Sequence, residues 1–219
     1  IKATELLLQE KIPQREIIIE SHDKDFKDGD IEPGKKSFQE VHAKHIVDTP
    51  HTPIPEVWTL SNNNYFLMIT NSGGGYSRLN NSFLNRWHED VTMDNWGMFF
   101  YIKNLNSGHY WSSGYQPCLE QGDSYEVSFE SDKVAFLRRD GNIETKTEIV
   151  VSPEHNVEIR RLILTNHGKS NRIVEVTSYF EPILIDQEGD IAHPAFTNLF
   201  IETDYIDIYV LHRDDPSVP

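Results

Sequence analysis

The sequence has a single cysteine, little positive charge and no long apolar run. Cys118 is the only cysteine among 219 residues, so no internal disulfide can form, and this favours a reducing compartment. No stretch approaches the ~18 apolar residues of a membrane span. With 20 basic and 35 acidic side chains, the formal net charge is −15. This balance argues against nucleic acid as a partner, because nucleic acid attracts basic surfaces.

The sequence also lacks the motifs of phosphate, metal and nucleophile chemistry. Three glycines stand in SGGGYSR, Ser72–Arg78, but no GxGxxG or GK[ST] pattern and no helix signal follows them, as a phosphate loop requires. A calcium loop starting at Asp23 fails, because it lacks Gly at its sixth position and Glu at its twelfth. No clear third ligand accompanies His42 and His45. We therefore expect no metal site and no cofactor in this chain.

Short alternating segments separated by turn signals recur after residue 48. Apolar and polar residues alternate in three of them: Ser124–Glu130, Asn142–Val151 and Arg172–Phe180. Such alternation predicts strands with one buried face, and in the last segment we expect Val174, Val176 and Phe180 to share a face. Asp140-Gly141, between two alternating runs, predicts a tight hairpin. Many antiparallel strands predict an all-β sandwich or barrel.

The first 48 residues differ from the rest in composition. Ala3–Ile12 is consistent with a short helix that Pro13 ends, and Arg15–Ser21 with a short strand. Ser21–Ser37 is charged and contains Gly and Pro, which favours a surface loop. We predict a linker segment over residues 1–48 and the β domain over residues 49–219.

Both ends of the sequence indicate a fragment of a longer protein. The chain begins at Ile1, without a methionine, and it stops shortly after an apolar run, Tyr205–Leu211. We expect further domains beyond the chain, so an activity of the parent protein need not reside in these residues.

The glycine triplet leaves two interpretations open. Gly73–Gly75 could form a bulge or tight bend between strands, since glycine permits backbone conformations that other residues avoid. Alternatively, the backbone approaches a ligand there, with Tyr76 and Arg78 beside it. Under the second interpretation, the glycines bend the chain so that these two side chains reach a saccharide or a neighbouring domain.

Aromatic and acidic residues gather downstream of the glycines. The four tryptophans Trp58, Trp87, Trp96 and Trp111 lie within one part of the chain; sugars stack on such rings, although core packing is the alternative. Glu89, Asp90 and Asp94 could form a capped turn with an ion pair to Arg86. The candidate carbohydrate-binding residues are Gly73, Gly74, Gly75, Tyr76, Arg78, Arg86, Trp87, Asp90, Asp94, Trp96, Trp111 and Tyr115.

Three motifs together carry a family resemblance: SGGGYSR, RWHEDVTMDNWG and AHPAF. With them, nearly the whole chain resembles the N-terminal β-supersandwich of the cellobiose/chitobiose phosphorylase family. It is more similar still to the phosphorylase-like region near the C-terminus of cyclic β-1,2-glucan synthases. One departure is Leu79, at a position where such sequences often have tryptophan after Gly-Tyr-Ser-Arg. The resemblance implies an antiparallel supersandwich related to galactose mutarotase, followed in the parent by a helical linker and an (α/α)6 barrel.

The resemblance also implies that catalysis takes place in a domain other than the supersandwich. The catalytic aspartate and the phosphate-binding residues belong to the barrel, so this chain would be a non-catalytic domain of a glycosyltransferase or glycoside phosphorylase. Its expected partners are an oligosaccharide or β-glucan, its own catalytic barrel and, as an open alternative, a second copy in a homodimer. The parent synthases imply the cytoplasmic face of the inner membrane, or the cytoplasm. A stand-alone carbohydrate-binding module and a purely structural or dimerisation domain remain alternatives.

Overall fold

The computed structural model describes residues 44–90, 93–199 and 201–202. The chain divides into two units, residues 1–40 and 41–219, and every described residue belongs to the second. The helix predicted at Ala3–Ile12 and the strand predicted at Arg15–Ser21 therefore lie outside the described residues. The division at residue 48 stays a prediction, although β1 (His45–Val47) pairs with β8 inside the sandwich.

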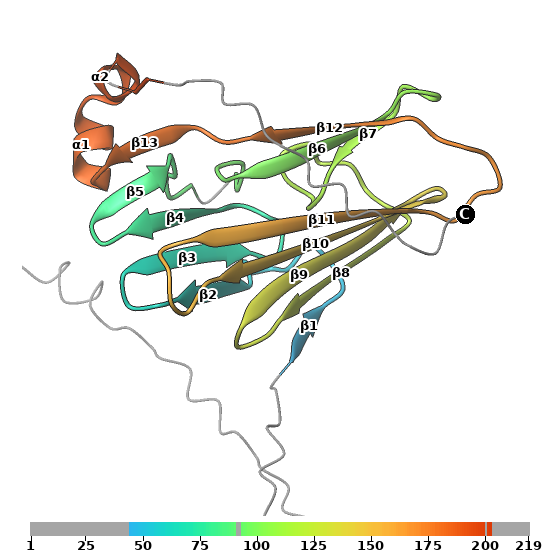
Figure 1. Cartoon of the computed structure of the whole chain (residues 1–219), viewed down its shortest axis with the longest axis horizontal. Helices are drawn as coiled ribbons and strands as arrows, with labels where there is room; N and C mark the ends of the chain where they lie inside the picture. The colour runs from blue at the N-terminus through green and yellow to red at the C-terminus, as the bar shows by residue number, and fades with distance from the viewer. Residues whose placement is uncertain (1–43, 91–92, 200, 203–219) are drawn as a thin grey trace, which may run out of the picture. The chain divides into compact units, whose positions relative to one another are not determined.

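The described strands form three antiparallel sheets (Figure 1). The first sheet has the order β1 (His45–Val47), β8 (Ser124–Phe129), β9 (Lys133–Asp140), β10 (Ile143–Val151), β11 (Glu158–Asn166). The second has the order β12 (Val174–Tyr179), β6 (Phe99–Asn104), β7 (Tyr110–Ser112). The third has the order β13 (Pro182–Ile185), β5 (Ser82–Asn85), β4 (Gly75–Leu79), β3 (Tyr65–Thr70), β2 (Val57–Ser61). The prediction of an all-β antiparallel supersandwich is confirmed.

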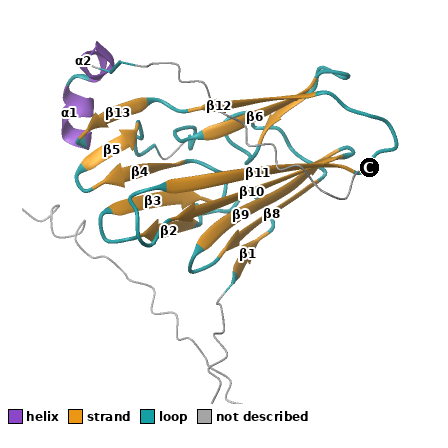
Figure 2. Ribbon diagram, viewed as in Figure 1, coloured by secondary structure: helices purple, strands orange, loops and turns teal. Residues whose placement is uncertain are grey.

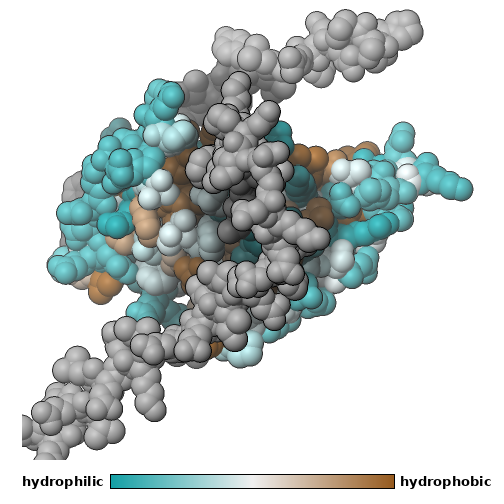
Figure 3. Space-filling view, turned by 90° about the horizontal axis from the view of Figure 1, so that it is seen from below, coloured by the Kyte–Doolittle hydropathy of each residue, from teal (hydrophilic) through white to brown (hydrophobic). Residues whose placement is uncertain are grey.

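The first sheet packs against the other two through separate core clusters. Leu67 and Ile69 of β3 meet Val127 of β8 and Val134 of β9 in the larger cluster. In the smaller cluster, Ile102 of β6 and Trp111 of β7 meet Ile143 of β10. Two layers of sheet thus bury one face each, as in other β-sandwiches (Figure 2). Hydrophilic residues lie along the margins of the face shown in Figure 3.

Two of the predicted strand features are confirmed in the first sheet. β10 alternates as expected, because Ile143, Thr145, Thr147 and Ile149 are buried whereas the residues between them are partly exposed. Asp140-Gly141 joins β9 to β10 as a tight hairpin, in which Asp140 pairs with Ile143. Gly141 has φ 63°, a left-handed conformation that glycine adopts without a steric cost.

β12 forms where a strand is predicted, but its apolar face is not buried among the described residues. Val176 is 45% exposed and Phe180 is 50% exposed. Val174 alone of the three packs against the smaller core cluster. The physical reason is that, among the described strands, β12 lies at the edge of its sheet and β11 is the last strand of the opposite sheet. The alternation predicted the strand correctly, but it did not predict how much of the strand's apolar face is buried by the opposite sheet.

Two short helices follow β13 and include the AHPAF motif. α1 (Gln187–Ala192) begins at Asp186, whose side chain accepts a hydrogen bond from the Gly189 amide in an ordinary N-cap. α2 (Pro194–Leu199) follows directly. Each helix has only six residues. A segment this short does not show the helical periodicity of apolar residues from which a helix is predicted. In the part of the chain described, no helix has the length and apolar character needed to cross a bilayer.

Candidate functional site

The glycine loop lies close to another part of the same chain. A Cβ on Gly74 would stand 2.1 Å from a carboxylate oxygen of Asp94, and one on Gly75 would stand 2.1 Å from the Met68 carbonyl oxygen. The Gly75 amide donates to the Trp96 carbonyl at 2.8 Å. Gly75 also has φ 152°, where only glycine is comfortable. The triplet therefore brings the segment around Asp94 against the end of β3.

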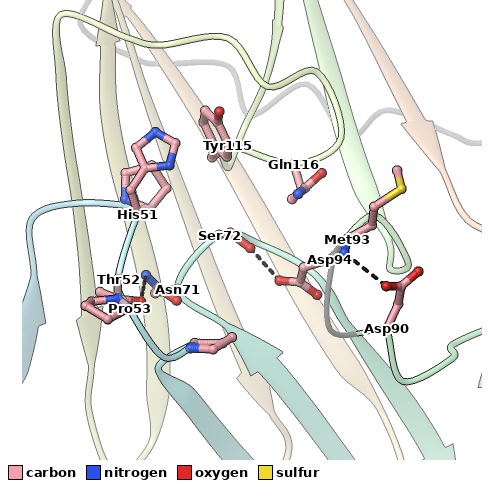
Figure 4. Close-up of a pocket in the computed structure, with 12 residues that line it drawn as sticks. His51, Thr52, Pro53, Asn71, Ser72, Asp90, Met93, Asp94, Tyr115 and Gln116 are labelled. Carbon is pink, nitrogen blue, oxygen red and sulfur yellow. Dashed lines mark hydrogen bonds between the residues drawn. The ribbon is translucent and has the colours of Figure 1, made fainter.

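Asp94 is the group that the loop encloses. The hydroxyls of Thr70 and Ser72 both donate to one of its carboxylate oxygens, at 2.5 Å from Ser72 (Figure 4). Burial raises the pKa of Asp94 above its ordinary value, and the two hydroxyl donors oppose that shift. The outcome is a carboxyl group with two fixed donors at the base of a surface hollow.

The outer face of the third sheet is aromatic beside this carboxyl group. Tyr76 has ring contacts with Phe83 at 4.8 Å and with Trp87 at 5.1 Å between centroids. Arg78 lies over the Phe66 ring at 4.9 Å from its centroid, a cation–π arrangement. We call Phe66, Tyr76, Arg78, Phe83 and Trp87 the aromatic face. Leu79 points away from it, because successive strand residues alternate between faces, so the departure at Leu79 concerns packing between the layers.

Two neighbouring hollows flank Asp94, and each has room for part of a sugar chain. The first has a volume of about 430 Å³ and is lined by Pro50, His51, Thr52, Pro53, Pro55, Asn71, Ser72, Asp90, Met93, Asp94, Tyr115 and Gln116 (Figure 4). The second has about 450 Å³ and is lined by Pro55, Val57, Met68, Thr70, Trp87, His88, Glu89, Asp90, Met93 and Asp94. Both are lined by Asp90 and Asp94. We call the pair the Asp94 hollows.

The structure brings several of the predicted residues together here. Trp87, Asp90, Asp94 and Tyr115 line the Asp94 hollows, and Gly73–Gly75 shape their floor through Asp94. Asp90 accepts a hydrogen bond from the Met93 amide at 3.2 Å. Aromatic rings and carboxylates thus share one surface, which is a combination that suits the C–H faces and hydroxyls of sugars.

Arg86 lies elsewhere, and its predicted ion pair with the acidic turn is wrong. Its guanidinium instead pairs with Asp190 of α1 at 2.8 Å and with Glu181 at 3.1 Å. The hydrogen bonds to Asp190 raise its pKa further, although burial opposes this. Arg86 therefore ties β5 to the helical segment, with little of its side chain left exposed.

The remaining tryptophans separate into structural and surface positions. Trp111 is 1% exposed and donates its indole N–H to the Thr145 hydroxyl at 3.2 Å, so its ring belongs to the smaller core cluster. Trp58 stacks on Phe129 in the larger one. Trp96 lines a different hollow, of about 260 Å³, together with Arg86 and Tyr101.

The sequence analysis missed three polar residues of the first hollow, of which Asn71 is buried. His51, Asn71 and Gln116 line the first hollow, and the His51 ring meets that of Tyr115 edge-on at 4.6 Å. Asn71 donates to the Thr49 carbonyl. It lies one residue before the SGGGYSR motif, and this position next to the motif is the feature of the sequence that could have indicated it. No described His, Cys, Asp or Glu residues gather in a group of three that could hold a metal ion.

The layered sheets and the hollowed outer face define an antiparallel β-supersandwich domain. The chain belongs to the family described as "Glycosyl hydrolase 94, supersandwich domain", which matches residues 43–217. It is 34% identical over 204 residues to the cyclic beta-(1,2)-glucan synthase NdvB of Rhizobium meliloti (strain 1021), an alignment that covers 93% of this chain and 7% of that protein.

Two phosphorylases are more distant relatives. The chain is 24% identical over 149 residues to the N,N'-diacetylchitobiose phosphorylase of Vibrio proteolyticus, covering 66% of this chain and 19% of that protein. It is 26% identical over 146 residues to the 3-O-beta-D-glucopyranosyl-beta-D-glucuronide phosphorylase of Paenibacillus borealis, covering 65% and 18%. The chain therefore spans less than a fifth of the length of these relatives.

Proposed function

We propose that this chain is the non-catalytic supersandwich of a larger β-glucan synthase or glycoside phosphorylase, and that it holds a glucan segment in the Asp94 hollows. The named activities of the relatives support a saccharide as ligand. The chemistry of the parent would take place in a catalytic barrel outside this chain. Its own residues would position the sugar and complete the wall of the active site.

One observation carries the proposal: a tryptophan ring and the carboxyl groups of Glu89, Asp90 and Asp94 line the same hollow on an exposed sheet face. Trp87 supplies a flat apolar surface, while Asp90 and Asp94 supply acceptors for sugar hydroxyls. Binding sites for small ligands combine an apolar lining with a few placed polar groups in this manner. The volume of about 450 Å³ accommodates a short saccharide segment rather than a long chain.

The aromatic face explains how these groups keep their positions. Tyr76 packs between Phe83 and Trp87, so it holds the tryptophan ring more than it offers its own ring to a ligand. Asp94 is held by Thr70 and Ser72. Such fixed side chains lose little conformational entropy on binding. This small entropic cost favours the binding of a neutral sugar, for which the favourable interactions are weak.

A titration of the isolated chain with linear β-1,2-glucan tests the proposal, with cellobiose for comparison. We expect saturable binding by calorimetry and a change in tryptophan fluorescence, with a dissociation constant near or below ~1 mM, equivalent to about −4 kcal/mol. Trp87→Ala should abolish the binding. Tyr110→Ala, an exposed aromatic residue outside the hollows, is the matched control and should bind as the unmodified chain does.

A structural role is the second candidate, and specific contacts favour it. Trp111 is buried in the core, Arg86 is committed to Asp190 and Glu181, and Tyr76 is enclosed by other rings. A flat titration with both sugars, from a chain whose thermal unfolding is cooperative, would support a domain that only shapes a pocket or a dimer. Equal affinity of the Trp87→Ala variant would move any sugar site away from the Asp94 hollows.

A further inference from the structure

A third hollow lies beside the second sheet, on the same side of the sandwich as the Asp94 hollows. Tyr101 of β6, which lines it, precedes the fully buried Ile102. Successive strand residues point to opposite faces, so Tyr101 points away from the first sheet. Met68 of β3, which lines the second Asp94 hollow, likewise alternates with the buried Leu67. We call this third space, of about 260 Å³, the Tyr101 hollow.

The Tyr101 hollow contains an aromatic lining. Tyr101 lies opposite Thr177 in the pairing of β6 with β12, and Tyr179 lies two residues further along β12. The two tyrosine rings are therefore on the same face of the second sheet, where they meet edge-on with 6.1 Å between centroids. Trp96 adds a third ring to the lining. Such rings provide flat apolar surfaces for the C–H faces of a sugar.

Hydrogen bonds fix the polar wall of the Tyr101 hollow. The Tyr179 hydroxyl donates to one carboxylate oxygen of Glu181 at 2.9 Å, and Arg86 donates to the other at 3.1 Å. The same guanidinium donates twice to Asp190, at 2.8 and 3.0 Å. Two carboxylates thus accompany one guanidinium, and this balance favours a neutral ligand over an anion. The fixed side chains also lose little conformational entropy on binding.

The Tyr101 hollow adjoins the second Asp94 hollow. His88 lines the second Asp94 hollow and Trp96 lines the Tyr101 hollow, and their rings meet edge-on with 5.1 Å between centroids. The consecutive residues Arg86 and Trp87 are divided in the same way, because Arg86 lines the Tyr101 hollow and Trp87 lines the second Asp94 hollow. The two hollows therefore have neighbouring walls, and one chain of sugar units can occupy both.

We propose that the Tyr101 hollow is a second saccharide subsite, which binds one unit of a neutral glucan that extends from the Asp94 hollows. The inference rests on the proposed function for the class of ligand and adds a separate place of contact. Tyr101 and Tyr179 contact the C–H faces of the sugar, while Glu181 and Asn95 accept hydrogen bonds from its hydroxyls. The volume of about 260 Å³ is below the ~300–1,000 Å³ of most ligand pockets, so it suits a single sugar ring.

The indole N–H signals of two tryptophans test this subsite by NMR of the full chain. Trp87 reports on the second Asp94 hollow and Trp96 on the Tyr101 hollow, and the variants Trp87→Phe and Trp96→Phe assign their signals. Linear β-1,2-glucan should shift both signals. A shift at Trp87 alone would overturn the second subsite and leave the proposed function intact. A shift at Trp96 alone would support the subsite but contradict glucan binding in the Asp94 hollows, and no shift at either would overturn both.

A truncation on β12 separates direct contact from an effect transmitted through His88. Tyr179 lines neither of the Asp94 hollows. Tyr179→Ala should weaken the binding of linear β-1,2-glucan roughly tenfold, because the glucan loses one of its two points of attachment. It should leave unchanged the affinity for the β-1,2-linked disaccharide of glucose, which the larger Asp94 hollows bind.

Tyr110→Ala is the matched control for this truncation. Tyr110 lies opposite Lys103 on the same face of the second sheet as Tyr101, but it does not line the Tyr101 hollow. This variant should bind both ligands as the unmodified chain does. Equal affinities of Tyr179→Ala and Tyr110→Ala for the glucan would overturn the inference. Equal losses of glucan and disaccharide binding in Tyr179→Ala would overturn it too, since the truncation would then act on the Asp94 hollows.

Discussion

The two halves of this sandwich contain similar alternating strands but bury them to different degrees. In the closed half, β8–β10 lie over β2 and β3, and Leu67, Val127 and Val134 are completely buried. In the open half, comprising β11–β13 with α1 and α2, Val176, Leu184 and Leu199 are 45%, 60% and 73% exposed, although Ile183 is buried. The difference shows that alternation determines which face of a strand is apolar, whereas the opposite layer determines whether that face is covered.

The largest effect should come from the buried ion pair of the closed half. Arg138 is fully buried, pairs with Asp140 at 2.6 Å and donates to the Gly114 and Glu120 carbonyls. Arg138→Met should lower the free energy of unfolding by roughly 3–5 kcal/mol, because it leaves Asp140 buried without its partner. Urea denaturation measures this loss.

The matched pair lies on the exposed side of β11. Arg161 pairs with Glu148, and its side chain is 65% exposed. Arg161→Met should cost less than about 1 kcal/mol, as is usual for surface ion pairs. Similar losses in the two variants would contradict the distinction between a buried and an exposed ion pair.

Apolar truncation should separate the halves almost as clearly. Leu67→Ala removes a fully buried side chain from the larger core cluster and should cost about 2–5 kcal/mol. Leu184→Ala removes a side chain that is 60% exposed and should stay within about 0.5 kcal/mol of the unmodified chain. Thermal and urea unfolding of both variants provide the comparison, and a large loss for Leu184→Ala would show that its side chain is covered after all.

The sequence determined the strands better than the layers. Period-two alternation identified β8, β10 and β12, and Asp140-Gly141 identified the hairpin, because these signals act within a few residues. The exposure of Val176 and Phe180 depends on which strand lies opposite, and no local pattern carries that information. α1 and α2 were missed because six residues are too few to show a helical period.

The candidate site shows the same limit. The glycine triplet marked a close approach, but its partners come from tertiary contacts. The pairing of β3 with β4 places the Met68 carbonyl, and hydrogen bonds from Thr70 and Ser72 place Asp94. Arg86 and Asp190 are more than a hundred residues apart in the sequence. The sequence analysis therefore predicted an ion pair between Arg86 and the carboxylates close to it in the sequence. Residue types indicated a sugar-compatible surface, and only tertiary pairing separated Trp87 from the buried Trp111.

The glycine loop allows a test of how much the close approach of two backbone segments contributes to the cost of adding one Cβ atom. Gly75→Ala places a Cβ against the Met68 carbonyl oxygen, and we expect a loss of about 2–3 kcal/mol from strain at a backbone conformation that other residues avoid. Gly108 also has a positive φ, but a Cβ there meets nothing within 4 Å. Gly108→Ala should therefore cost only about 1–2 kcal/mol. Equal losses would show that the close approach adds nothing to the conformational strain.

The smallest effects should appear in the pH dependence at the boundary of the two halves. Glu158, at the start of β11, is buried, which disfavours its charge, but Arg160 and hydrogen bonds from Ser77, Arg160 and Tyr65 outweigh this and lower its pKa. Its ion therefore contributes stability above the unfolded value near 4.5, and this contribution is lost as the pH falls through the folded pKa. Glu158→Gln should reduce the acid dependence of the unfolding free energy by at most about 1.4 kcal/mol per pH unit.

Asp94 should show the opposite sign, because burial raises its pKa in the folded chain. The folded state holds this proton more tightly, so the group lowers stability as the pH rises from its unfolded value, near 3.8, through the folded pKa. Asp94→Asn should remove that decline, whereas Glu158→Gln should leave it in place. Unfolding free energies measured from pH 3 to pH 7 separate the two carboxyl groups. Slopes that change in the same direction in both variants would show that the hydroxyls of Thr70 and Ser72, and not burial, control Asp94.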